Sequence, residues 1–174
     1  MLVGGACVGA LPAETIELKR AAFQGDVDKV QKLLAAGVSP DVRSPATGVA
    51  LADAAAGRHR QVVRVLIAAG ANPNIASDSG YTPLIAAASV GYAEIVADLV
   101  AAGAAVDANF DYGWTALHIA ARRGHGAVVE RLLDAGANPL VEGDRGSTPR
   151  DLARRFGHGD IEVMLGEAER RLSR

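Results

Sequence analysis

The most informative part of the sequence is "WTALHIAARRGHGAVVERLLDAGANPL", residues 114–140. Residues 117–123 predict a short helix whose paired alanines are small enough to let neighbouring helices approach closely. Residues 126–135 predict a second helix, because aliphatic side chains recur at helical spacing along one face. Gly136 follows the last turn, where a glycine in the left-handed conformation ends a helix at low steric cost. The stretch therefore predicts two short helices joined by a tight turn.

The same pattern recurs along the chain with a period of 33 residues. The segment "YTPLIAAASVGYAEIVADLVAAGAAVD", residues 81–107, repeats the features of residues 114–140. Three sets of glycines mark the period: Gly37, Gly70, Gly103 and Gly136; Gly80, Gly113 and Gly146; Gly91, Gly124 and Gly157. A helix pair of this size cannot bury its own apolar face, so neighbouring pairs must stack into one continuous core.

Helix starts and core positions follow from the same register. Thr82 and Thr148 are the expected N-caps, and the proline after each suits the first turn of a helix. Leu99 and Leu132 are expected to lie in the core.

This pattern resembles the ankyrin repeat. The pieces "TALHIAA", "GH", "VV", "LL" and "AGAN" stand at that family's spacing, and the resemblance covers about residues 14–174. It implies an all-α fold, a solenoid of about five helix-turn-helix repeats with projecting β-hairpin loops. The repeats are expected at about residues 14–43, 44–76, 77–109, 110–142 and 143–174. Abundant Ala and Gly, with Arg far more frequent than Lys, point to a bacterial source.

The two end repeats carry polar residues where the pattern expects buried ones. These are Lys19, Arg20 and Lys29 in the first repeat and Arg150, Glu162 and Gly166, itself in place of a leucine, in the last. Polar residues at core positions are tolerated where no further repeat stacks, so both ends are expected to be caps.

The second repeat departs from the pattern as well. Residues 49–51 replace the Thr-Pro-Leu opening, and Arg58 takes a position that holds glycine in other repeats. Its first helix and the hairpin before it are expected to be irregular.

Composition bounds the class of protein. The 174 residues suit one domain, and 49% hydrophobic with 22% charged residues indicates a globular chain. A net charge of −2 gives no general attraction to nucleic acid or anionic membranes. One cysteine excludes an internal disulfide, and no apolar stretch reaches the length of a membrane-spanning helix.

The N-terminal stretch "MLVGGACVGALPAE" leaves two interpretations open. Residues 1–13 are either a tail, disordered or loosely packed, or the remnant of a truncated signal peptide with a small-residue cleavage site at residues 8–10. A basic leading region is absent, and Gly4 disfavours a lipoprotein at Cys7. The chain as given is expected in the cytoplasm, and a signal remnant would place it in the periplasm or outside the cell.

The sequence offers no constellation for catalysis or for a cofactor. His59, His125 and His158 occupy one position of the repeat, and His118 falls in the "TxLHxA" position; the resemblance implies that such histidines brace turns. No phosphate loop, nucleophile motif or metal-ligand spacing is visible. We therefore expect no enzymatic activity, no catalytic residue, no cofactor and no metal.

The segment "ANFDYGWTAL", residues 108–117, concentrates aromatic residues in a chain poor in them. It is expected to be a hairpin tip, where alternation places Tyr112 and Trp114 on one side. Tyr, Trp and Arg dominate the energetics of protein interfaces. Phe110 is expected to pack between adjacent hairpins, whereas Trp114 occupies a position that scaffold packing does not need.

The resemblance implies that the chain binds a partner protein with its hairpin tips and the exposed side of its first helices. Carried over residue by residue, that surface comprises Asp78, Ser79, Tyr81, Ser89, Val90, Asp111, Tyr112, Trp114, Arg122, Arg123, Asp144, Arg145, Ser147, Arg155 and Phe156. The chain is expected to act as a monomer that does not bind nucleic acid. The alternative is a small accessory or regulatory protein for an exported enzyme.

Two charged rows follow from the period. Asp78, Asp111 and Asp144 recur along the tips, and Arg122, Arg123 and Arg155 recur along the first helices. Stacked helices lie about 8–10 Å apart, too far for the three aspartates to share one cation. The aspartates either brace their turns through backbone hydrogen bonds or form an acidic rim above a basic floor.

Overall fold

The computed structural model describes residues 13–44 and 48–172. The signal-remnant hypothesis falls almost wholly on residues 1–12, which lie outside these ranges. The compartment and the role beside an exported enzyme therefore stay predictions.

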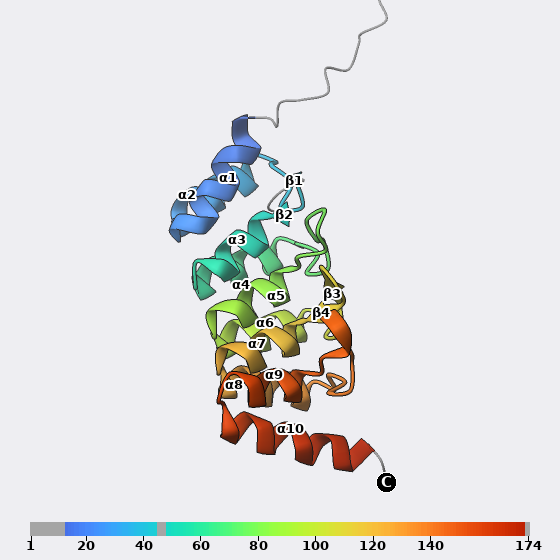
Figure 1. Cartoon of the computed structure of the whole chain (residues 1–174). Helices are drawn as coiled ribbons and strands as arrows, with labels where there is room; N and C mark the ends of the chain where they lie inside the picture. The colour runs from blue at the N-terminus through green and yellow to red at the C-terminus, as the bar shows by residue number, and fades with distance from the viewer. Residues whose placement is uncertain (1–12, 45–47, 173–174) are drawn as a thin grey trace, which may run out of the picture.

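Within the described residues the chain forms helix pairs stacked in sequence order (Figure 1). The first helices of the pairs are α1 (Ala13–Gln24), α3 (Ala50–Ala56), α5 (Pro83–Val90), α7 (Ala116–Arg123) and α9 (Pro149–Arg155). The second helices are α2 (Val27–Ala35), α4 (Arg60–Ala68), α6 (Ala93–Ala101), α8 (Gly126–Asp134) and α10 (Gly159–Leu172).

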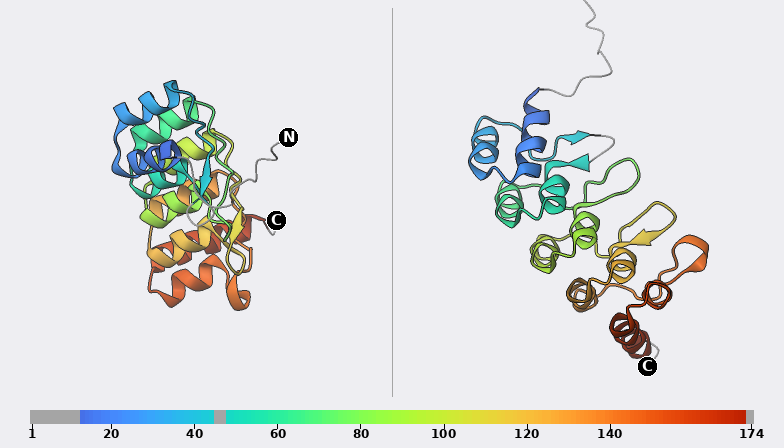
Figure 2. Two further views of the ribbon diagram at one scale, coloured as in Figure 1. Left: turned by 90° about the horizontal axis from the view of Figure 1, so that it is seen from above. Right: turned by 60° about the vertical axis from the view of Figure 1, so that its left-hand side comes forward.

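The loops between pairs project to one side of the stack (Figure 2, right). Two contain antiparallel hairpins: β1 (Arg43–Ser44) pairs with β2 (Gly48–Val49), and β3 (Asn109–Phe110) pairs with β4 (Trp114–Thr115). Residues 77–81 and 143–147 form equivalent turns, each closed by a backbone hydrogen bond of 3.1 Å and 3.0 Å respectively. The predicted all-α solenoid with projecting hairpins is confirmed.

Helix ends follow the expected capping chemistry. The Thr82 side chain accepts a hydrogen bond from the backbone N–H of Ile85, and Pro83 occupies the first turn of α5. Gly91 ends that helix in the left-handed conformation, with a φ of 75°. At the start of α9, the Thr148 side chain accepts a hydrogen bond from the backbone N–H of Asp151.

The core runs through the whole stack as one cluster. Alanine pairs such as Ala87–Ala88 and Ala120–Ala121 are fully buried, so the first helices meet at close range. Leu99 and Leu132, on the second helices, are also fully buried, as predicted. Each pair therefore buries its apolar face only against its neighbours.

Histidines tie successive repeats together. The Nε2 atoms of His59, His125 and His158 lie 2.8, 3.4 and 3.1 Å from backbone carbonyl oxygens of the preceding first helix. Each ring also lies over a glycine of that repeat; a Cβ on Gly124, for example, would come within 2.6 Å of the His158 ring. The turn-bracing role expected from the resemblance is thus built on a histidine–glycine pair.

The second repeat is more regular than its sequence indicates. Helix α3 begins at the position equivalent to the start of α7, so the expectation of an irregular first helix is wrong. Hairpin β1–β2 also lies in register with β3–β4, although residues 45–47 of its turn are outside the described residues. Arg58 takes the left-handed glycine conformation, with a φ of 62°. The next repeat has Tyr92 where others have histidine, so no imidazole ring needs the space over Arg58.

The polar residues of the first repeat do not all face outward. Lys19 Nζ lies 2.6 Å from an Asp53 carboxylate oxygen and donates to the Gly48 carbonyl at 2.9 Å, with only 12% of the lysine side chain exposed. Lys19 therefore joins the first repeat to the second, so it does not mark a face on which no repeat stacks. Burial raises the pKa of Asp53, and the neighbouring ammonium opposes that shift.

At the other end, Arg150 takes the place of a buried leucine. Its guanidinium lies against Gly166, where a Cβ would come within 3.0 Å of the arginine Cζ, and it donates to Glu169 at 2.9 Å. The glycine thus makes room for the larger side chain, and the carboxylate neutralises it.

We expect Leu132→Ala to lower the free energy of unfolding by about 2–5 kcal/mol, because it removes buried methyl groups and leaves a cavity. Urea titration measures this change. A loss below about 1 kcal/mol would contradict the core position of Leu132.

Two glycine substitutions separate backbone strain from histidine packing. Gly136→Ala meets no atom within 4 Å and should cost about 1 kcal/mol, from left-handed strain alone. Gly124→Ala adds displacement of the His158 ring and should cost at least about 1 kcal/mol more. Equal losses in paired urea titrations would show that the ring contact contributes nothing.

Candidate partner-binding surface

The hairpin β3–β4, the end of α7 and the end of α9 bring aromatic and cationic side chains into one stack. The Arg122 guanidinium lies 5.4 Å from the Trp114 ring centroid and 5.2 Å from that of Phe156. Trp114 also stacks on His118, with ring centroids 6.1 Å apart and an interplanar angle of 27°. Arg155 lies 6.0 Å from the Phe156 ring. Cation and ring therefore alternate across two repeats, an arrangement that cation–π attraction favours.

A hollow of about 240 Å³ lies beside this stack. It is lined by Phe110, Asp111, Tyr112, Trp114, Ile119, Arg122 and Asp144. Tyr112 stands at the turn with a left-handed φ of 61° and is 83% exposed. The chain is not an extended strand here, so the alternation argument fails, yet Tyr112 and Trp114 still line the same hollow.

The expectation that scaffold packing does not need Trp114 is wrong. Its ring is partly buried against the core, and a Cβ on Gly143 of the next loop would come within 2.9 Å of it. Phe110 packs between hairpins as expected, edge-on to Tyr81 with centroids 5.4 Å apart. Trp114 therefore contributes to the scaffold as well as to the surface.

His118 holds this region in place from beneath. Its Nδ1 accepts the Thr115 backbone N–H at 3.1 Å, which leaves Nε2 to donate to the Ser147 carbonyl at 3.1 Å. The neutral ring thus caps α7 and reaches the next loop. Burial lowers the pKa of His118, partly offset by the bond to Ser147.

Comparison with protein families gives a match to a model of three ankyrin repeats. The matches cover residues 18–110, 51–142 and 94–169, nearly the whole described stack. The chain belongs to the ankyrin repeat family. Comparison with curated proteins gives no match. Ankyrin repeats are generally protein–protein interaction modules and are typically non-enzymatic.

Among residues 13–44 and 48–172, no group of His, Cys, Asp and Glu side chains could hold a metal ion. No helix of this part of the chain is long and apolar enough to cross a membrane.

One predicted surface residue, Arg123, and a second arginine outside that prediction, Arg58, form internal hydrogen bonds. Arg123 donates to the Ser89 carbonyl at 2.8 Å, and Arg58 donates to the Val90 carbonyl at 2.8 Å. Both guanidiniums thereby stabilise the carbonyl end of α5, which has no basic residue in its own last turn. Sequence reasoning missed this role of Arg58, because its left-handed position was visible but the reach of its side chain was not.

The three aspartates of the predicted row have different interaction partners. Asp78 pairs with Arg43, a partner that sequence reasoning also missed, and Asp144 lies 3.9 Å from Arg145. Asp111 contributes its backbone N–H to the Ser79 carbonyl at 3.2 Å, which joins two ankyrin loops. None of the three carboxylates accepts a backbone hydrogen bond from the described residues. The turn-bracing alternative is therefore not supported, and Asp111 and Asp144 instead line the hollow.

The lowered pKa of His118 predicts a pH-dependent stability. A depressed folded-state pKa adds stability above the ordinary imidazole pKa of about 6.5, and that stability is lost as pH falls. We expect the free energy of unfolding to fall between pH 7.5 and 5, more steeply than in His118→Gln. Because one proton is involved, the two slopes of unfolding free energy against pH can differ by at most about 1.4 kcal/mol per pH unit. Parallel pH series of urea titrations measure both slopes. The other histidines are present in both proteins, so their contributions to the pH dependence cancel in the comparison. Identical slopes would contradict the buried neutral ring.

Proposed function

We propose that the stack formed by Trp114, Arg122 and Phe156, with Tyr112 at its edge, is the centre of a partner-protein interface. The observation that carries this proposal is the state of Arg122. Within the described residues its guanidinium forms no ion pair and donates no hydrogen bond, although two aromatic rings hold it in position.

Such a guanidinium is available to bind a carboxylate of a partner protein. Five N–H donors in a rigid plane match the geometry of a carboxylate, and contacts with two rings reduce the side-chain entropy lost on binding. The rings around it supply the large aromatic area that dominates interface energies. Exposure of Phe156 at 45% and of Tyr112 at 83% leaves that area accessible.

The charges around the hollow narrow the choice of partner. Asp111 and Asp144 line it together with Arg122, so a complementary surface carries both a carboxylate and a basic group. A nucleic acid would place its phosphates against these carboxylates, which disfavours it. A monomeric stack that binds another protein fits this arrangement best.

The first experiment identifies the partner. A photo-crosslinking amino acid replaces Tyr112 in one variant and Arg64, which is exposed on α4 and does not line the hollow, in a matched control. We expect one crosslinked protein at position 112 in cells of the source organism, and none at position 64. Crosslinking only from position 64 would contradict the proposed surface.

Binding of that protein then tests Arg122. Arg122→Ala should weaken binding at least tenfold, and Arg122→Lys should recover little because it loses the planar fork. The control Arg64→Ala should bind normally, and unfolding free energies should change by under about 1 kcal/mol. Trp114→Ala is a less direct test, since the ring also packs against the scaffold. Unchanged affinity of Arg122→Ala would reject the proposal.

A further inference from the structure

Side-chain hydrogen bonds join the successive loops that follow the second helices. In three of them one side-chain oxygen holds the next loop by accepting a backbone N–H 31 residues further on. The pairs are Asp41 with Asn72 at 2.9 Å, Asn74 with Ala105 at 2.7 Å, and Asp107 with Asn138 at 3.0 Å. This ladder fastens each loop to its successor.

The ladder ends at Leu140. This residue follows Asp107 by one period of 33, yet its side chain has no oxygen with which to accept a hydrogen bond. Beyond it α10 continues as a helix of 14 residues, compared with nine in α8, through the positions where a fifth loop would turn. The fourth loop therefore has no loop stacked on it, and a leucine stands where the others carry a polar acceptor.

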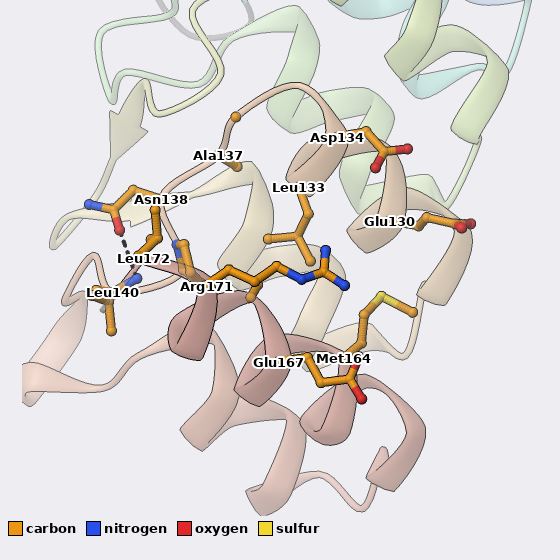
Figure 3. Close-up of a pocket in the computed structure, with 13 residues that line it drawn as sticks. Glu130, Leu133, Asp134, Ala137, Asn138, Leu140, Met164, Glu167, Arg171 and Leu172 are labelled. Carbon is orange, nitrogen blue, oxygen red and sulfur yellow. Dashed lines mark hydrogen bonds between the residues drawn. The ribbon is translucent and has the colours of Figure 1, made fainter. Parts of the chain in front are cut away.

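A groove of about 620 Å³ opens at this point, between the fourth loop and the end of α10 (Figure 3). Its apolar wall includes Leu133, Leu140, Met164 and Leu172. Leu140 is 49% exposed and Leu172 is 61% exposed, so α10 covers the leucine of the loop only in part. Close packing within the protein does not account for these two side chains.

The rim of the groove is acidic. Glu130, Asp134 and Glu167 line it, against a single arginine, Arg171. None of the three carboxylates forms an ion pair with a described residue. An apolar wall with an acidic rim complements a segment that carries both leucine-like and basic side chains.

We propose that this groove is a second docking surface, for a basic amphipathic segment of a partner protein. It shares no lining residue with the hollow beside Arg122, so the proposal stands or falls independently of the function proposed above. The segment would place apolar side chains against Leu140 and Leu172 and lysine or arginine beside Glu130, Asp134 and Glu167.

The probe is a synthetic twelve-residue helical peptide with leucine at positions i, i+3, i+4 and i+7 and lysine elsewhere. A charge-reversed peptide carries glutamate in place of every lysine. Backbone amide NMR spectra of the ¹⁵N-labelled full chain locate binding, and titration gives the dissociation constant. We expect the lysine peptide to shift resonances of residues 130–140 and 164–172, and the glutamate peptide to leave them unchanged.

Leu140→Asp is the decisive variant. The scaffold accepts aspartate at the equivalent positions 41 and 107, and the extra negative charge would strengthen purely electrostatic binding of lysine. We expect it instead to weaken binding of the lysine peptide at least tenfold, because apolar contact is lost. The variant Glu130→Gln/Asp134→Asn/Glu167→Gln should weaken binding while keeping that contact.

Three outcomes would overturn the proposal. One is equal binding of the two peptides; another is unchanged binding in Leu140→Asp. The third is self-association of the wild-type chain in sedimentation equilibrium that Leu140→Asp abolishes, because a second copy would then be the occupant.

Discussion

The close approach of the first helices is the constraint on which the rest of this structure depends. A helix pair with so small an apolar face is stable only if its neighbour lies near enough to cover it. Fully buried alanines, such as Ala88 and Ala121, permit that distance on every step of the stack. The regular spacing of the hairpins, and hence of every side chain on their side, follows from it. Larger residues along this seam would separate the repeats and expose the leucines behind them.

Departures from the repeat pattern are compensated in neighbouring elements. The compensated pairs are Lys19 with Asp53, and Arg150 with Gly166. In each case one residue provides the space or the charge that its neighbour requires, so the stack keeps its geometry while its sequence varies. A substitution at one member therefore has to be judged together with the other.

At the surface proposed beside hairpin β3–β4, one scaffold residue would also serve recognition. Trp114 contacts both His118 and Arg122, and its contact with Arg122 helps to position the guanidinium. If the proposed interface is correct, stability and binding are coupled through this one ring. The groove at Leu140 differs, because it exists where the loop ladder stops and its leucines are needed by no further repeat.

The sequence by itself determined the fold, because a period of 33 residues, threonine caps and left-handed glycines are local signals that survive without knowledge of long-range contacts. It also identified which residues line the hairpins and the first helices. Only the tertiary structure decided which of them are available. Arg122 and Arg123 are adjacent in the chain, yet Arg123 donates to Ser89 in the preceding repeat. The Arg122 guanidinium instead contacts two rings and donates no hydrogen bond to the described residues. The same holds for the groove, whose apolar wall joins residues 133–140 to residues 164–172. Contacts between residues 30 or so apart depend on the direction of each side chain across the stack, and a repeating pattern of residue types does not encode that direction.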